Sequence, residues 1–295
     1  MPVTTPGGDV ASAHRRLADS PLRPTLSGVR VLLISTYELG RQPVHVASPA
    51  GRLAAAGHDV DTIDVAVERL DEDRVRAADA VAVSVPMHTA MRLASTVAGR
   101  VRDIAPGTPL ALYGLYAAVN ADRTAGHLVD RVIAGEYEDE LVAWLDDIED
   151  GTAEGDAVRV DLGRTRFETP LRASLPPLDR YARLSIGGEE RLVGAVEASH
   201  GCVHRCRHCP LPAVYDGRLR IVDPGVVLAD IAQQVAAGAR HITFGDPDFL
   251  NGPHHALRIV RAMRDRFPDL TYDITVKSNG LKYGAPQQER KYLDF

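Results

Sequence analysis

Three cysteines are the residues with the clearest capacity for chemistry. Cys202, Cys206 and Cys209 are the only cysteines of the chain, and they lie within eight consecutive residues. An odd number of thiols so closely spaced cannot form a disulfide framework, whereas a metal ion or cluster can bind all three. Thiolates are the usual ligands of iron-sulfur clusters, and three of them on a four-iron cube leave one iron without a protein ligand. The spacing therefore predicts a [4Fe-4S] cluster with one open iron.

The same loop leaves a structural zinc site as the alternative. Residues 199–210 read SHGCVHRCRHCP, so a fourth zinc ligand could come from His200, His204 or His208. Zinc sites more often join two short two-ligand motifs from separate segments, and this chain has no second motif of that kind. Two arginines in the loop favour thiolate over thiol. We therefore favour the cluster over zinc.

The elements that precede the cysteines form a regular repeat. Five short, nearly continuous apolar runs alternate with five stretches of helical character. Parallel strands need crossover connections, which place helices over both faces of a sheet. The pattern predicts a flavodoxin-like or Rossmann-like doubly wound parallel sheet. The expected strands lie at 29–35, 60–65, 80–85, 110–113 and 132–134, and the expected helices at 49–57, 71–78, 89–104, 120–128 and 138–148.

A second, shorter repeat surrounds the cysteines. A strand at 192–198 leads directly into the cysteine loop, and Asp223 and Pro224 mark the start of a helix that Gly238 ends. Another strand, helix and strand are expected at 241–244, 253–267 and 270–276. The thiols thus project from the C-terminal rim of a sheet. The domain boundaries expected from these patterns are a disordered tail at 1–27, a Rossmann-like domain at 28–150, a linker at 151–191 and a cluster-binding domain at 192–295.

Composition limits the partners. The 34 basic and 40 acidic residues give a net charge of -6, which provides no positive field for nucleic acid. No stretch approaches the ~20 apolar residues of a membrane span, and the N-terminus lacks the pattern of a signal peptide. We expect a cytoplasmic protein without nucleic-acid or membrane partners.

The spacing of the cysteines, directly after the first strand of a (βα) repeat, resembles the signature of the radical SAM superfamily. The resemblance implies an enzyme whose open iron chelates the amino and carboxylate groups of S-adenosylmethionine. It further implies reductive cleavage of that ligand to a 5'-deoxyadenosyl radical, with an electron donor such as a flavodoxin or ferredoxin. The residues of this chain give no candidate for a catalytic side chain beyond the cofactor.

The resemblance also implies contacts to S-adenosylmethionine. His208 stands where the superfamily usually has an aromatic residue near the adenine. Gly245 and Asp246 stand where it places a Gly-Gly-Glu-like turn that meets the amino group, and Lys277 where it often has a polar or basic residue near the ligand. The alternative is a purely structural role, in which Asp246 or Asp248 caps the following helix.

Further segments resemble radical SAM proteins with an N-terminal cobalamin (B12)-binding domain. They are GEYEDEL at 135–141 and LPPLDRY at 175–181, while LISTYELG at 33–40 and PMHT at 86–89 resemble the group named for a CUAEP or CCAEP tail, which this chain lacks. The implied activity is a cobalamin-linked methyl transfer to a small molecule or peptide. No Asp-x-His-x-x-Gly motif is present, and the isolated His45 and His88 are of a kind more often found on surfaces or loops.

A hypothesis of another class follows from the length of the second repeat. The superfamily has about six βα units, and an eight-unit barrel takes ~250 residues, whereas about three strands are expected between Leu192 and Phe295. The alternative is therefore a truncated, catalytically incompetent cluster-binding protein. A nicotinamide or flavin dinucleotide site has no support, because there is no Gly-x-Gly-x-x-Gly.

Overall fold

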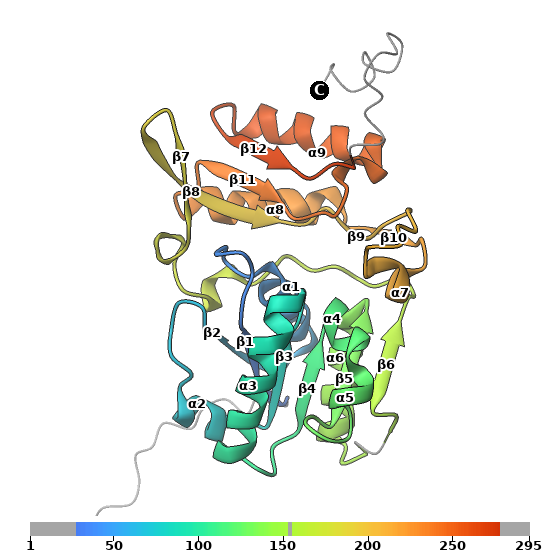
Figure 1. Cartoon of the computed structure of the whole chain (residues 1–295). Helices are drawn as coiled ribbons and strands as arrows, with labels where there is room; N and C mark the ends of the chain where they lie inside the picture. Colours follow the sequence, from blue (N-terminus) through green and yellow to red (C-terminus); the bar gives the residue numbers. More distant parts are fainter. Residues whose placement is uncertain (1–27, 153–154, 278–295) are drawn as a thin grey trace, which may run out of the picture.

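A six-stranded parallel sheet forms the first half of the molecule (Figure 1). The computed structural model describes residues 28–152 and 155–277. The strand order is β2-β1-β3-β4-β5-β6, in which the first five strands follow the flavodoxin-like order. The predicted doubly wound sheet is thereby confirmed. Its strands are β1 (Arg30–Ser35), β2 (Asp59–Asp64), β3 (Ala80–Ser84), β4 (Leu110–Tyr113), β5 (Arg131–Gly135) and β6 (Val158–Asp161).

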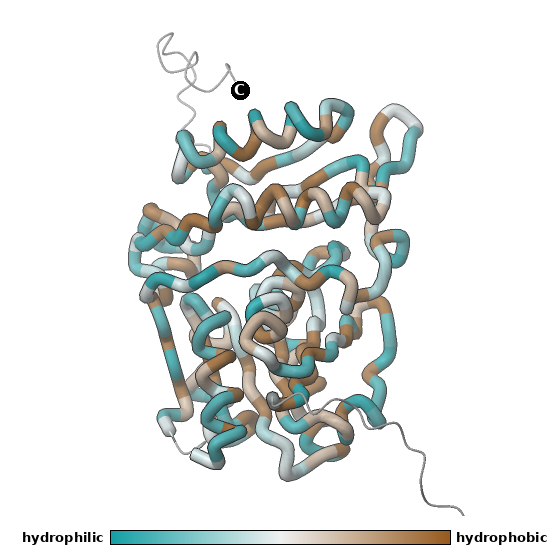
Figure 2. The backbone as a smooth tube through the Cα atoms, turned by 180° about the vertical axis from the view of Figure 1, so that it is seen from behind, coloured by the Kyte–Doolittle hydropathy of each residue, from teal (hydrophilic) through white to brown (hydrophobic). Residues whose placement is uncertain are grey.

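Helices cover both faces of this sheet. Apolar side chains of α1 and α6 pack on one face, and those of α2 and α3 on the other. The central strands are largely apolar because both of their faces are buried, and the five residues of β3 are all buried. In Figure 2 the helices alternate between brown and teal turns, as helices covering a core do. These helices are α1 (Val44–Ala56), α2 (Glu72–Ala77), α3 (His88–Ile104), α4 (Leu115–Val119), α5 (Ala121–Thr124) and α6 (Tyr137–Glu149).

A four-stranded sheet in the order β12-β11-β8-β7 forms the second half. Strands β8, β11 and β12 are parallel, and β7 pairs with β8 as an antiparallel hairpin. Helices α8 and α9 share one hydrophobic core with this sheet. This is the beginning of a (βα) barrel, as predicted. The elements are β7 (Arg183–Ile186), β8 (Glu189–Val196), α8 (Pro224–Ala236), β11 (His241–Phe244), α9 (Pro253–Arg266) and β12 (Thr271–Ile274), with a short helix η3 (Phe249–Asn251) before α9.

The cysteine loop has structure of its own. Strands β9 (Ser199–Gly201) and β10 (Leu219–Ile221) pair in antiparallel fashion, and α7 (Leu211–Tyr215) lies between them in the chain. Side chains of α7 pack against Ala134 and Leu115 of the first domain. The loop therefore contacts both halves of the molecule.

The segment expected as a linker, 151–191, contains β6, η1 (Arg172–Ser174), η2 (Leu178–Arg180) and β7. It is fixed to both domains by a buried arginine, Arg172, described below. The expected tail at 1–27 and the chain after residue 277 lie outside the described residues. Within the described part, no helix has the length and apolar character needed to cross a membrane.

Candidate functional site

The cysteine loop begins at a glycine, and any other residue at this position would force the neighbouring chain to shift. Gly201 ends β9 with φ +74°, in the left-handed region. A Cβ at this position would lie 2.3 Å from the carbonyl oxygen of Arg218 and 2.7 Å from the ring of Tyr215. The chain therefore turns here at close quarters, and this turn places Cys202 beside the neighbouring strand.

Hydrogen bonds fix the backbone of the cysteine loop and one of its thiols. The side chain of Asn251 donates from Nδ2 to Sγ of Cys202 at 3.3 Å. The backbone N–H of Cys202 donates to Arg218 at 3.1 Å, and that of Cys209 donates to the carbonyl of Cys206 at 3.2 Å. An amide donor on sulfur stabilises the thiolate form that a cluster or metal ion requires. Cys202 is buried, and the other two thiols are half-buried.

The spread of the thiols bears on the zinc alternative. Around one tetrahedral zinc ion, ligand atoms lie only about 4 Å apart. Among the residues that the structure describes, two groups of three potential ligands have their donor atoms within 4.8 Å of one another, and neither contains a cysteine. In this structure the three thiols therefore do not lie as close together as the ligands of one zinc ion.

The other predicted site residues lie in different surroundings. His208 is exposed and Lys277 is half-buried, while Gly245 borders a cavity between the two domains. The carboxylate of Asp246 is buried and accepts hydrogen bonds from the N–H of Ala198 at 2.9 Å and from Oγ of Ser199 at 2.6 Å. Burial raises the pKa of Asp246 to about 6 in spite of these donors.

Asp246 thus fixes the start of the cysteine loop, and its contact with S-adenosylmethionine stays a prediction. Asp248 accepts from the N–H of Leu250 at 3.3 Å and caps η3, so the capping interpretation describes Asp248 rather than Asp246.

The cavity lies between the C-terminal edge of the first sheet and the cysteine loop. Its volume is about 240 Å³. The rule for open α/β sheets places ligands at this edge. Cys209 and Gly245 contribute to the same wall, so two of the predicted positions meet here. The first domain contributes His45, Pro86, Met87, Leu115 and Tyr137 to the lining.

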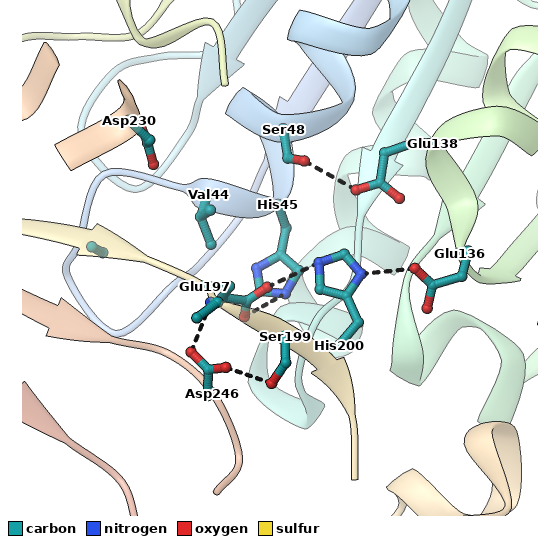
Figure 3. A network of polar contacts seen from close by, with 12 residues as sticks. Val44, His45, Ser48, Glu136, Glu138, Glu197, Ser199, His200, Asp230 and Asp246 are labelled. Atoms are coloured by element: carbon teal, nitrogen blue, oxygen red, sulfur yellow. Dashed lines mark hydrogen bonds and ion pairs between the residues drawn. The ribbon is translucent and has the colours of Figure 1, made fainter. Parts of the chain in front are cut away.

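A buried polar network borders the cavity and joins the domains (Figure 3). Glu197, at the end of β8, faces Nε2 of His45 at 3.4 Å and Nε2 of His200 at 3.5 Å. The other ring nitrogens face Glu38 at 3.1 Å and Glu136 at 3.2 Å. Sequence reasoning treated His45 as a surface or loop residue, and it missed Glu197 altogether. Glu136 carried the only signal, through its motif.

The network contains cationic imidazoles. Burial alone lowers the pKa of His45, but the Glu197 and Glu38 carboxylates outweigh it and raise the pKa to about 9. Burial likewise lowers the pKa of His200, and Glu136 leads the carboxylates that raise it to about 10. The two rings therefore act as positive charges that bridge carboxylates of different domains.

Solved structures with a similar fold are known. No family model matches the chain, and no curated protein matches it. The radical S-adenosylmethionine methyltransferase TsrM from Kitasatospora setae, solved with cobalamin and a [4Fe-4S] cluster bound, is 17% identical with a TM-score of 0.59. The structure of TsrM with its tryptophan substrate and the S-adenosylmethionine analogue aza-SAM bound is 18% identical in sequence, with a TM-score of 0.59. Each match covers 82% of this chain and 52% of the other, so the chain spans about half the length of these structures. The chain therefore shares with these structures the fold of a Rossmann-like domain joined to a partial (βα) barrel.

Proposed function

We propose that this chain is a radical SAM protein in which Cys202, Cys206 and Cys209 hold a [4Fe-4S] cluster. One observation carries the proposal. Three thiols share one hydrogen-bonded loop at the carboxyl end of β8, above a cavity that both domains line. The reduced cluster, when bound, supplies the electron that cleaves S-adenosylmethionine at the open iron.

The chain's own residues prepare this site. Asn251 and the turn at Gly201 orient Cys202, and Asp246 ties Ser199 to the end of β11 so that the loop starts from a fixed point. A Cβ added at Gly245 would lie 3.2 Å from Cγ of Glu197, so the glycine leaves room for that side chain against the backbone. We infer that S-adenosylmethionine occupies this side of the cavity, with its ammonium group toward the carboxylates at the end of β8 and β11.

For the first domain we propose a cobalamin site at the C-terminal edge of the sheet. Both ring nitrogens of His45 face carboxylates, and so do those of His200. The His45 imidazole, which the first domain contributes to the cavity, is therefore not free to bind cobalt, in agreement with the missing Asp-x-His-x-x-Gly motif. We therefore expect cobalamin to bind without a histidine from the cavity wall. The proposed reaction is methyl transfer to a small molecule or peptide, with a flavodoxin or ferredoxin as electron donor.

Anaerobic reconstitution tests the first part. We expect a brown protein with about four iron and four sulfide ions per chain, as one cubane requires. With dithionite and S-adenosylmethionine it should form 5'-deoxyadenosine, or S-adenosylhomocysteine if methyl transfer dominates. The Cys206→Ala variant should lose both cluster and products. A colourless zinc protein would contradict the cluster, and a fully loaded cluster without either product would favour the catalytically incompetent alternative.

Gel filtration tests the second part. The reconstituted chain is incubated with hydroxocobalamin and separated from the free cofactor, and the visible spectrum of the protein peak is recorded. Comigration of about one corrin per chain supports the cobalamin site. A protein peak without corrin absorbance argues for hydrogen-abstraction chemistry that does not involve cobalamin.

A further inference from the structure

Three buried donors from both domains converge at a point separate from the cysteines. Glu136 follows β5, Glu138 lies in the first turn of α6, and His200 lies in β9. One donor atom from each lies within 4.8 Å of the other two. All three residues are buried, with exposed fractions of 0%, 1% and 8%. Figure 3 shows their side chains turned toward one another from the two domains.

Two carboxylate oxygens of this group are unsatisfied. In the described part of the chain, Oε1 of Glu136 and Oε2 of Glu138 are buried without a hydrogen-bond partner. The second oxygen of Glu138 accepts from Oγ of Ser48 at 3.0 Å, and the second oxygen of Glu136 faces Nδ1 of His200 at 3.2 Å. Buried carboxylate oxygens are normally paired or bound to a metal ion. A cation placed between the two carboxylates would satisfy both oxygens.

The histidine has the support that metal-bound histidines usually have. Such a ring donates its second N–H to a carboxylate, which fixes the ring and leaves the first nitrogen for the metal. Nε2 of His200 faces Glu197 at 3.5 Å, and Glu197 is itself held by His45 at 3.4 Å. A metal ion at Nδ1 would replace the proton that the cationic ring directs toward Glu136, while the proton on Nε2 would stay directed toward Glu197.

We propose that Glu136, Glu138 and His200 bind a divalent first-row transition-metal ion. One imidazole and two carboxylates form a mixed ligand set that suits Mn²⁺, Fe²⁺ or Zn²⁺. Ligand atoms around one tetrahedral ion lie about 4 Å apart or less, and one donor atom of each residue already lies within 4.8 Å of the others. Because His200 lies two residues before Cys202, the ion would tie the cysteine loop to the edge of the first sheet.

Titration with Mn²⁺ tests this site independently of any activity. Mn²⁺ is the probe because thiolates select softer ions, and the full chain is used with its cluster already loaded. Loss of the free-ion signal in electron paramagnetic resonance measures binding. We expect one ion per chain, displaced by Zn²⁺. We expect E136Q and E138Q each to weaken binding at least about 10-fold, with a loss of similar order in E197Q.

Two control variants give the titration its specificity. E140Q changes a carboxylate on the same helix, and E149Q changes the second donor group, formed with His58 and Asp146. Both should bind Mn²⁺ as the unmodified chain does. Circular dichroism confirms that the glutamine variants are folded. For any variant that fails to fold, anomalous scattering from Mn²⁺-soaked crystals of the unmodified chain replaces it, and a peak among the three side chains is expected.

Four results would overturn the proposal. They are the absence of Mn²⁺ and Zn²⁺ binding at millimolar concentration, binding that survives both E136Q and E138Q, binding that E149Q removes, and an anomalous peak elsewhere. None of these results affects the cluster, because the iron and sulfide content of each variant is measured separately.

Discussion

Arg172 is the side chain whose removal should disturb the molecule most sharply. It lies in η1 with 6% of its surface exposed. Its Nε and Nη2 donate to the two carboxylate oxygens of Asp230 on α8, each at 2.8 Å. Nη2 also donates to the carbonyl of Ala195 at 2.6 Å, and Nη1 to that of Gln42 at 3.3 Å. One guanidinium thus joins the segment between the domains to both of them.

Replacement of Arg172 by methionine should cost about 3 to 5 kcal/mol of folding free energy. Methionine keeps much of the packing of the arginine stem but removes the charge, so Asp230 is left buried without a partner. Breaking a buried ion pair in this way costs about 3–5 kcal/mol. For domains of 150–250 residues, each kcal/mol shifts the melting temperature by about 2–4 °C. We therefore expect a melting temperature lower by about 6 to 20 °C.

Urea unfolding followed by circular dichroism measures the effect. The double variant R172M/D230L should be more stable than R172M alone by at least about 1 kcal/mol, because an apolar pair can replace a buried ion pair nearly without loss. The control R164M changes an exposed arginine of the same segment and should stay within about 0.5 kcal/mol of the unmodified chain. The reasoning is refuted if R172M also stays in that range, or if the double variant costs the sum of R172M and D230L.

Three further predictions concern the site. Burial alone lowers the pKa of His45, but Glu197 and Glu38 raise it to about 9. The protonated His45 therefore stabilises the folded chain fully below pH 6.5, and this stabilisation is lost as the pH rises to about 9. Over that window, the difference in unfolding free energy between the unmodified chain and H45Q should shrink by up to about 3 kcal/mol. A difference that is independent of pH would contradict this. Gly201→Ala should lower the iron bound per chain, because φ is +74° and the Cβ meets backbone; unchanged iron content would show that the turn can relax. Asn251→Ala removes an amide donor from a thiol and should lower the reduction potential of the cluster in a potentiometric titration, whereas an unchanged or higher potential would argue against that contact.

The first sheet could be predicted from the sequence because the burial of each strand and helix shows in the pattern of its own residues. The central strands β1, β3, β4 and β5 are buried on both faces, so each reads as a short apolar run, and β3 consists of Ala, Val and Ser alone. The helices between them show four-residue spacing, as in the buried Ala90, Ala94 and Ala98 of α3. The position of the cysteine loop followed in the same way, from the apolar residues that end β8.

Two of the edge strands, β6 and β7, and the segment between the domains could not be predicted in this way. Strand β6 (Val158–Asp161) is mostly exposed at the edge of the sheet, so its residues VRVD carry no apolar run. Strand β7 (Arg183–Ile186) is equally exposed, and pairing with β8 rather than burial defines it. Arg172 is an ordinary surface residue by composition, and only the tertiary contact with Asp230 explains its burial.

The site network was unpredictable for the same reason. His45 and Glu197 are separated by 152 positions in the chain, and neither belongs to a motif whose spacing shows the other. Glu136 drew notice only through its resemblance to a known segment. A histidine between two carboxylates is a property of the folded molecule, and sequence reasoning sees only an isolated histidine near a strand end.

The two domains meet through buried charges as well as apolar contact, and this difference has a structural consequence. Where α7 packs on the first domain, Leu211 and Val214 join a small apolar cluster with Ala134. Apolar contacts are not directional, so such a cluster favours association without fixing one register. The Arg172–Asp230 pair and the histidine-carboxylate network on the other side of the cavity require defined distances and angles. Any sliding of one domain would leave buried charges unpaired, at a cost of several kcal/mol. The charged contacts therefore hold the cysteine loop at one distance from the edge of the first sheet, as the proposed reaction between two cofactors would require.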